Sequence, residues 1–155
     1  MNTWLIDTAL FKSLASEGPK GASLRGWIET HEDLIFLSVA SLVEIEAAIE
    51  RTRARHAKRA DALHEWLDGL VTAFSDRIHP VDVKVAVRAG MLLPRCRDGH
   101  VRHRFHDAVL AATAQVYGHG LLTKRAGLRR MDKGQSGVPV MAHGGRRLRL
   151  PRYPS

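Results

Sequence analysis

Short apolar runs alternate with longer amphipathic segments along this chain. Trp4–Ile6 is an apolar run that ends at Asp7, and Leu34–Leu37 is a second run of similar length. Leu121–Thr123 forms a third run, and Val138–Val140 forms a fourth, which we assign to a sheet edge because its central proline cannot donate a ladder hydrogen bond. Runs of this length, bounded by polar or turn residues, are typical of buried β-strands.

Between these runs, apolar residues recur at the three- and four-residue spacing of α-helices. The most regular stripe consists of Leu63, Leu67, Leu70 and Phe74, with acidic residues on the other faces of the same helix. Helices are also predicted over Thr8–Leu14, around Leu24–Ile28, over Ser41–Ile49, over Val83–Leu93 and over Phe105–Val116. Strands that alternate with helices predict an α/β fold with a mainly parallel sheet.

Two of the predicted helix starts carry capping residues. Asp82 precedes the helix over residues 83–93 and has the character of an N-cap. Ser41 has Glu44 three residues later, the spacing of a capping box, which predicts a helix that begins after Ser41. Acidic residues near helix starts therefore have an ordinary structural explanation, and a chemical role for any one of them needs further support.

Length and composition indicate one globular domain in a reducing compartment. The chain has 155 residues, of which 45% are hydrophobic and 26% charged, as in ordinary globular proteins. It has no uninterrupted apolar run near the roughly 20 residues of a membrane span, and Asp7 interrupts any early leader-like segment. The single cysteine, Cys96, cannot form an internal disulfide. We therefore expect a cytoplasmic protein.

The net charge of +8 is distributed unevenly along the chain. Residues 1–76 contain 8 basic and 12 acidic side chains, whereas residues 77–155 contain 16 basic and 4 acidic ones. A basic half attracts polyanions such as nucleic acid, although a merely solvated basic surface has the same composition. The last residues hold four arginines and no acid, so we divide the chain into a domain over 1–141 and a basic tail over 142–155.

Three acidic residues from distant segments fall where parallel sheets collect functional groups. Asp7 follows the first predicted strand, Glu44 lies in the helix after the second, and Asp107 lies in the helix before the third. The carboxyl ends of parallel strands meet at one edge of the sheet, so these side chains can converge there. Clustered carboxylates repel each other unless a hard cation such as Mg²⁺ or Mn²⁺ neutralises them. The pattern predicts a divalent metal site.

Histidines offer a different metal hypothesis. His100, His103 and His106 are spaced three residues apart, and zinc sites use closely spaced histidines. No cysteine or further histidine is spaced to complete a tetrahedral set nearby. These histidines are better explained as loop residues beside a nucleic-acid groove.

Three segments of the chain resemble the acidic motifs of the PIN-domain family. They are Leu5–Thr8, Leu37–Ile45 and Phe105–Ala114, and they contain Asp7, Glu44 and Asp107 in the order and at the separations usual for that family. The stretch Ala62–Gly90 is similar to the VapC and FitB toxin branch. The resemblance covers residues 3 to about 140.

The resemblance implies both a fold and an activity. The fold would be a three-layer α/β sandwich with about five mainly parallel strands and helices on both faces. The activity would be metal-dependent RNA cleavage by the toxin of a toxin–antitoxin pair, with Asp7, Glu44 and Asp107 as catalytic residues that bind Mg²⁺ or Mn²⁺. Its partners would be RNA, an antitoxin through which DNA is contacted, and a second copy of the chain in a homodimer within a larger complex.

Residues beside the acids are candidates for substrate binding, because basic and hydroxyl side chains hold phosphates without reading sequence. We expect this role for Thr8, Arg104, His106, Thr123, Lys124 and Arg125.

The chain departs from the family pattern after the third predicted strand. Where the family has a Thr-Arg-Asn-like segment with a fourth acid a few residues later, this chain has Thr123-Lys124-Arg125 and then Leu128. Asp132 is the nearest acid beyond that position. The departure leaves an alternative open, in which the domain binds RNA or an antitoxin without cutting.

Overall fold

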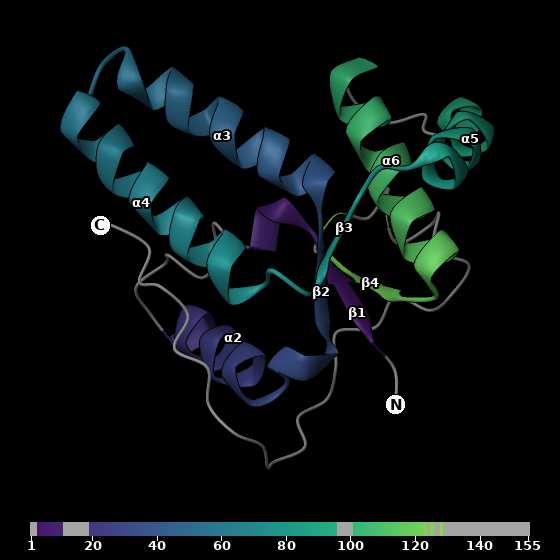
Figure 1. Cartoon of the computed structure of the whole chain (residues 1–155), viewed down its shortest axis with the longest axis horizontal. Helices are drawn as coiled ribbons and strands as arrows, with labels where there is room; N and C mark the ends of the chain where they lie inside the picture. The colour runs from purple at the N-terminus through teal and green to yellow at the C-terminus, as the bar shows by residue number, and fades with distance from the viewer. Residues whose placement is uncertain (1–2, 11–18, 96–100, 124, 126–127, 129–155) are drawn as a thin grey trace.

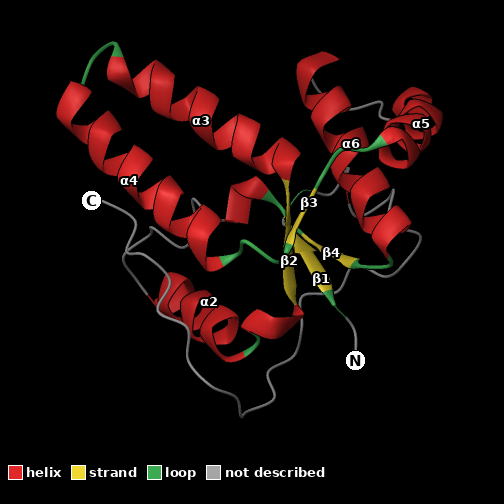
Figure 2. Cartoon of the chain, viewed as in Figure 1, coloured by secondary structure: helices red, strands yellow, loops and turns green. Residues whose placement is uncertain are grey.

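The computed structural model of the chain describes residues 3–10, 19–95, 101–123, 125 and 128, and it consists of a parallel sheet covered by helices (Figures 1 and 2). The side chains of residues 19–21 and 101–104 are outside this description. The elements in chain order are β1 (Trp4–Ile6), α2 (Pro19–Thr30), η1 (Glu32–Leu34), β2 (Ile35–Ser38), α3 (Val39–Arg53), α4 (Ala57–Ala73), β3 (Ile78–His79), α5 (Val83–Leu92), η2 (Leu93–Arg95), α6 (Val101–Tyr117) and β4 (Gly120–Leu122). Residues 8–10 are also helical.

The four strands of the described residues form one parallel sheet in the order β3-β2-β1-β4. Leu5 of β1 is paired with Phe36 of β2 on one side and with Leu121 of β4 on the other. Helices α2, α3 and α4 lie on one side of the sheet, and α5 and α6 lie on the other (Figure 1). The predicted three-layer α/β sandwich is therefore confirmed, with four strands among the described residues where about five were predicted. The predicted strand Val138–Val140 lies outside the described residues.

Alternation along the strands divides the apolar side chains between two cores. Leu5 and Leu121 point toward α5 and α6, whereas Ile6 and Leu122, the next residues along each strand, belong to the core beneath α2, α3 and α4. Successive side chains of a strand point to opposite faces, so a sheet covered on both sides needs continuous apolar runs. This requirement explains why the strands appear in the sequence as unbroken apolar segments.

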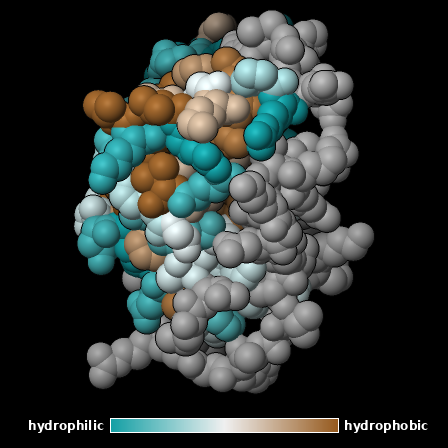
Figure 3. All heavy atoms as spheres, turned by 90° about the vertical axis from the view of Figure 1, so that its right-hand side faces the viewer, coloured by the Kyte–Doolittle hydropathy of each residue, from teal (hydrophilic) through white to brown (hydrophobic). Residues whose placement is uncertain are grey.

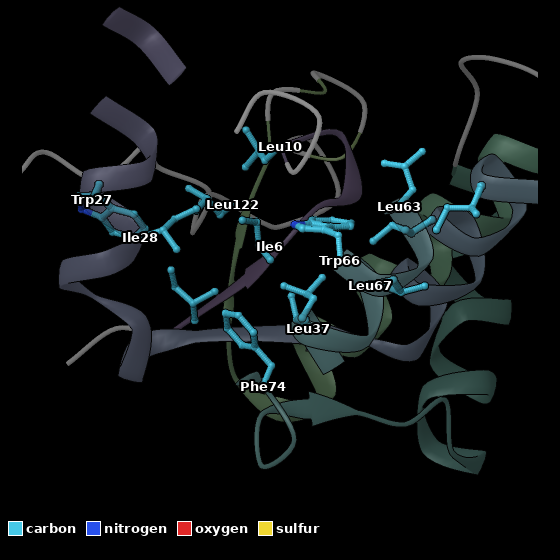
Figure 4. Close-up of a cluster of buried hydrophobic side chains, with 14 of the residues drawn as sticks. Ile6, Leu10, Trp27, Ile28, Leu37, Leu63, Trp66, Leu67, Phe74 and Leu122 are labelled. Atoms are coloured by element: carbon cyan, nitrogen blue, oxygen red, sulfur yellow. The ribbon is translucent and has the colours of Figure 1, made fainter. Parts of the chain in front are cut away.

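The larger core lies between the sheet and α2, α3 and α4 (Figure 4). The predicted stripe on α4 is confirmed, because its four large side chains are buried and face this core: Leu63, Leu67, Leu70 and Phe74. Trp27 of α2 and Trp66 of α4 are buried in the same core. Both tryptophans therefore stabilise the fold and are not available to stack on nucleic-acid bases.

The smaller core depends on the small residues of α6. Buried alanines recur along this helix, at Ala108, Ala111, Ala112 and Ala114. Side chains of this size let the helix backbone lie close to the sheet. The predicted N-cap of α5 is confirmed: Asp82 accepts a hydrogen bond of 2.9 Å from the backbone N–H of Val85. The hydroxyl of Tyr117 donates to the other oxygen of Asp82 at 3.1 Å and links α6 to α5.

The predicted capping box is wrong. Helix α3 follows β2 directly, and its N-cap is Ser38, whose Oγ accepts from the backbone N–H of Ala40 at 3.2 Å. Ser41 is instead a buried helical residue whose hydroxyl has no hydrogen-bond partner. Because the helix begins three residues earlier than predicted, Glu44 lies in its second turn and is not needed for capping.

Two further differences concern elements that the apolar pattern did not reveal. Strand β3 has only two residues, Ile78 and His79, and pairs with Leu37 and Ser38 of β2. So short a strand has no apolar run of its own, and Pro80 directly after it resembles the start of the next helix. Helix α6 begins at Val101, before the first apolar residue of its predicted stripe.

Among the described residues, none of the helices combines the length and the apolar character that crossing a membrane requires.

Buried His119 and half-buried His79 form a pair against Phe36 on the α5–α6 side of the sheet. Nε2 of His79 lies 2.7 Å from Nε2 of His119, and Nδ1 of His119 lies 2.6 Å from the hydroxyl of Thr3. Both rings stack on Phe36. Burial, with a smaller contribution from His79, lowers the pKa of His119 to about 4, and burial lowers the pKa of His79 as well. The pair is therefore stable only in its neutral form.

This pair predicts that the protein loses stability in mild acid. The pKa of His119 falls from 6.5 to about 4 on folding, so the unfolded chain binds more protons between these values. Stability from this group is complete above pH 6.5 and is lost as the pH falls toward 4, by on the order of 1–3 kcal/mol. We expect the free energy of unfolding of His119→Gln to fall less steeply with decreasing pH than that of the wild type. Urea denaturation from about pH 7.5 to about pH 4 covers the window between the two pKa values and measures this difference.

The control is His56→Gln, because His56 is exposed and makes no side-chain cap hydrogen bond. The free energy of unfolding of His56→Gln should depend on pH as that of the wild type does. An unchanged slope in His119→Gln would show that the pair does not govern acid sensitivity.

Candidate active site

Asp7 lies at the carboxyl edge of the sheet, and helices α3 and α6 bring Glu44 and Asp107 to the same place. Asp7 is the first residue after β1, and its backbone N–H still donates to the carbonyl of Leu122 at 3.0 Å. Glu44 and Asp107 each lie in the second turn of their helix. Arg125 contacts both Asp7 and Asp107, and His106, on the same helix as Asp107, contacts Glu44. The convergence that the sequence analysis expected is thus present in the fold.

The Asp7 carboxylate is fully buried and held by several donors. Oδ2 accepts from the hydroxyl of Thr123 at 2.7 Å and from Nε of Arg125 at 2.9 Å. Oδ1 accepts from Nη2 of Arg125 at 2.7 Å and from the backbone N–H of Ala9 at 3.4 Å. An ionised carboxylate is tolerated in the interior only when it is paired and hydrogen-bonded in this way.

Arg125 bridges two of the acids. Besides its two-pronged contact with Asp7, its Nη1 lies 2.7 Å from Oδ1 of Asp107. The backbone N–H of Arg125 donates to Oγ1 of Thr123 at 3.0 Å, so the chain is also anchored at this point independently of the guanidinium. The planar guanidinium suits this arrangement because it presents several donors in a fixed fork.

Glu44 is paired with a histidine. Nε2 of His106 lies 2.7 Å from Oε2 of Glu44, although the two atoms are not aligned for a regular hydrogen bond. Contact with His106 lowers the pKa of Glu44 to about 2, against the opposing effect of burial; the nearby Thr8 hydroxyl and Arg125 lower it further. Glu44 is therefore ionised at neutral pH.

The other charged groups respond to burial and to each other. Burial raises the pKa of Asp107, and the nearby charge of Arg125 partly offsets this effect. Burial acts to lower the pKa of Arg125, but its hydrogen bonds to Asp7 and its attraction to all three acids outweigh burial, so the net shift is upward. The positive charge of Arg125 is thus stabilised by the acids that it neutralises.

Several buried polar atoms of this cluster lack an aligned hydrogen bond. They are Oγ1 of Thr8, Oε2 of Glu44, Oδ1 of Asp107 and Nε2 of His106. Buried polar atoms normally find partners, and such exceptions concentrate at functional sites. The oxygens among them are the hard donors that Mg²⁺ and Mn²⁺ prefer.

The carboxylate oxygens of this cluster are of the type that binds a divalent cation, but in this structure they contact Arg125 and His106. Within the described ranges, no three His, Cys, Asp or Glu side chains surround a common point where a metal ion could bind. The positive charge between Asp7 and Asp107 comes from the guanidinium of Arg125. The loop position expected for the three histidines is wrong for His103 and His106, which lie in helix α6, where His106 contacts Glu44. His100 and the side chain of His103 lie outside the described residues.

The candidate substrate-binding residues divide into two groups. Thr8, His106, Thr123 and Arg125 lie within the acidic cluster. Lys124 and the side chain of Arg104 are outside the described residues. The sequence predicts Arg125 only as a phosphate ligand, whereas the fold places it between Asp7 and Asp107. The one sequence feature that indicates this bridging position is a basic residue where the family has an asparagine-like residue.

The position expected for a fourth acid belongs to the core. Leu128 is fully buried and packs with the side chains beneath α5 and α6. An acid in this apolar setting would need a partner. Asp132 lies outside the described residues.

Comparison with protein families gives one match, to the PIN domain, over residues 4–134. No curated protein sequence matches the chain significantly.

Solved structures with a similar fold include two from one toxin–antitoxin complex, FitAB. The crystal structure of FitAcB from Neisseria gonorrhoeae has a TM-score of 0.67 and 21% sequence identity, covering 84% of this chain and 94% of that chain. The structure of FitAB bound to an IR36 DNA fragment has a TM-score of 0.66 and 22% identity, covering 84% of this chain and 91% of that chain. At these identities the similarity concerns the fold.

The Thr123 hydroxyl predicts a measurable contribution to stability. It donates to the buried Asp7 and accepts from the backbone of Arg125, so Thr123→Val leaves both groups short of a partner. We expect the free energy of unfolding in urea to fall by about 1–3 kcal/mol. Thr72→Val is the control, because Thr72 is exposed on α4 and bonds only to a helix carbonyl; it should change stability by less than about 0.5 kcal/mol. Equal effects of the two substitutions would contradict this role.

Proposed function

Because the chain belongs to the PIN-domain family, we propose that it is a metal-dependent endoribonuclease and the toxin of a toxin–antitoxin pair. PIN domains are generally nucleases. The observation that carries the proposal is the convergence of Asp7, Glu44 and Asp107 from three separate elements of the fold. Capping does not explain Glu44, because the N-cap of α3 is Ser38, nor Asp107, which lies in the second turn of α6.

The three carboxylates would hold Mg²⁺ or Mn²⁺. When bound, such an ion lowers the pKa of a water ligand and stabilises negative charge on a phosphate oxygen. Asp7, buried and oriented by Thr123, is the most rigid of the three candidate ligands. Glu44 is already ionised and so needs no proton loss before it can bind a cation or orient a water molecule.

Basic and hydroxyl side chains beside the acids would hold the RNA backbone. From their sequence positions, six residues are proposed for this role: Thr8, Arg104, His106, Thr123, Lys124 and Arg125. Phosphate contacts of this kind position a substrate but do not select its sequence. The basic composition of the second half of the chain supports a polyanionic substrate.

A second function is supported by one specific observation, the buried Leu128 at the position of the fourth acid. In this alternative the domain binds an antitoxin or RNA without cleavage, because the remaining acids are already engaged by Arg125 and His106. The two proposals differ in whether purified protein cuts RNA when Mg²⁺ is added.

The proposed protein partners are an antitoxin and a second copy of this chain. The similar structures are those of FitAcB and of FitAB bound to DNA, and by analogy we propose that DNA is contacted here through the antitoxin. Helix α5 offers a surface for such partners: Val83, Val87 and Met91 are 79%, 63% and 60% exposed and follow each other at four-residue spacing. Hydrophobic side chains gather among hydrophilic ones on this side of the molecule (Figure 3). We assign this stripe to the homodimer contact.

We further propose a cytoplasmic location and a domain boundary near residue 141, followed by a basic tail over 142–155. The single cysteine supports the location, and the composition of the tail supports the boundary. The tail lies outside the described residues.

The nuclease proposal predicts that Asp107→Asn and Glu44→Gln remove activity. Each amide keeps the size of the acid but loses a charge that the cation needs, so Mg²⁺-dependent cleavage of single-stranded RNA should fall at least about 100-fold. The rate is measured on a labelled oligonucleotide, and circular dichroism checks the fold of each variant. Asp7→Asn should be equally inactive, but its fold is at greater risk because Asp7 is fully buried.

The matched control is Asp68→Asn, since Asp68 is largely exposed on α4, away from the cluster. It should cut RNA at the wild-type rate. Folded Asp107→Asn that retains wild-type activity would refute the nuclease assignment, and a wild-type protein without activity would favour the non-cleaving alternative.

The homodimer assignment predicts that Val87→Lys converts a dimer to a monomer, because a charge would be buried in the contact. Light scattering after size-exclusion chromatography measures the mass. Val43→Lys is the control, as Val43 is 69% exposed on α3. A dimer that survives Val87→Lys would place the contact elsewhere.

A further inference from the structure

Arg125 lies where a divalent cation would have to lie, between Asp7 and Asp107. Its three guanidinium nitrogens all contact these acids: Nε and Nη2 contact Asp7 at 2.9 and 2.7 Å, and Nη1 contacts Asp107 at 2.7 Å. Both oxygens of Asp7 and Oδ1 of Asp107 are thereby engaged. A cation that binds both acids must use some of these same oxygens.

Resting on the proposed function, we propose that Arg125 is a built-in counter-ion that competes with the divalent cation for Asp7 and Asp107. A guanidinium and a divalent ion on the same oxygens repel each other strongly at this distance, particularly in a partly buried site. The two therefore bind as alternatives. In the metal-free site the protein's own guanidinium offsets part of the negative charge, and metal binding requires the guanidinium to leave.

The local structure allows this exchange without unfolding. The backbone of Arg125 is anchored to Thr123 through a separate hydrogen bond, so the peptide can stay in place while the side chain rotates. The side chain of Arg125 is 28% exposed, whereas that of Asp7 is fully buried. The guanidinium can thus move into solvent, and the acid stays where it is.

The surrounding residues explain why the competition matters in this chain. Glu44 is engaged by His106, so Arg125 is the main positive charge available to Asp7 and Asp107 among the described residues. Leu128 stands where the family resemblance implies a fourth acid, and it is buried in the core. The cluster therefore offers a cation less negative charge, and the single guanidinium offsets part of the charge of the two acids that it bridges.

The test is the affinity for Mn²⁺ in the absence of RNA, measured by titration calorimetry on wild type and Arg125→Gln. Removal of the competitor should tighten binding by about tenfold or more. In EDTA, Arg125→Gln should have a lower Tm than the wild type, because two acids lose their counter-ion, and Mn²⁺ should raise the Tm of the variant more than that of the wild type.

Two further variants serve as a control and as a conservative substitution. Arg53→Gln removes an arginine that pairs with Glu50 and Asp61 on the surface, and it should leave Mn²⁺ affinity unchanged. Arg125→Lys keeps the charge but loses the fork, so its affinity should lie between those of wild type and Arg125→Gln. If Arg125→Gln does not fold, tighter binding by Arg125→Lys than by wild type carries the test.

The outcomes separate this inference from the nuclease proposal. Equal or weaker Mn²⁺ binding by Arg125→Gln overturns the inference even if the wild type cuts RNA. Tighter binding by Arg125→Gln supports it even if no RNA is cut. No binding by either protein overturns the inference, because the acids would then not be a latent metal site.

Discussion

The structure depends on how three buried or half-buried carboxylates are neutralised at one edge of a sheet. Removing charge from water is costly unless an opposite charge and hydrogen bonds compensate for it. Here Arg125 bridges Asp7 and Asp107, and His106 accompanies Glu44. An acidic cluster of this kind has no value for packing, so its presence indicates a function that needs concentrated negative charge.

The fold makes this cluster through its topology. The order β3-β2-β1-β4 places β1 beside β4, so Asp7 and Thr123 lie next to each other although they are far apart in the sequence. Helix α6 precedes β4, and its alanines let it lie close to the sheet, which brings Asp107 to the same edge. The apolar faces that stabilise the three layers are thus also what holds the acids together.

The same contacts link stability with the proposed chemistry. Because Arg125 pairs with Asp7 and Asp107, the protein can fold without a metal ion. Among the described residues, the acids do not surround a common point where a metal ion could bind. A nuclease of this type must then exchange an internal ion pair for a bound cation. Strong pairing in the metal-free protein and strong metal binding are opposed, since both use the oxygens of Asp7 and Asp107.

The sequence by itself determined the layers, the main strands and the identity of the three acids, because apolar periodicity and motif spacing are local properties of the chain. Its motifs predicted membership of the PIN-domain family, which the family match over residues 4–134 confirms. The apolar pattern could not reveal β3, which has two residues, or the start of α3 at Val39. Only the tertiary structure decided that Leu128 is a core residue and that Arg125 bridges Asp7 and Asp107. The partner of a charged side chain depends on which distant segments the fold brings within a few ångströms, and no local pattern encodes that distance.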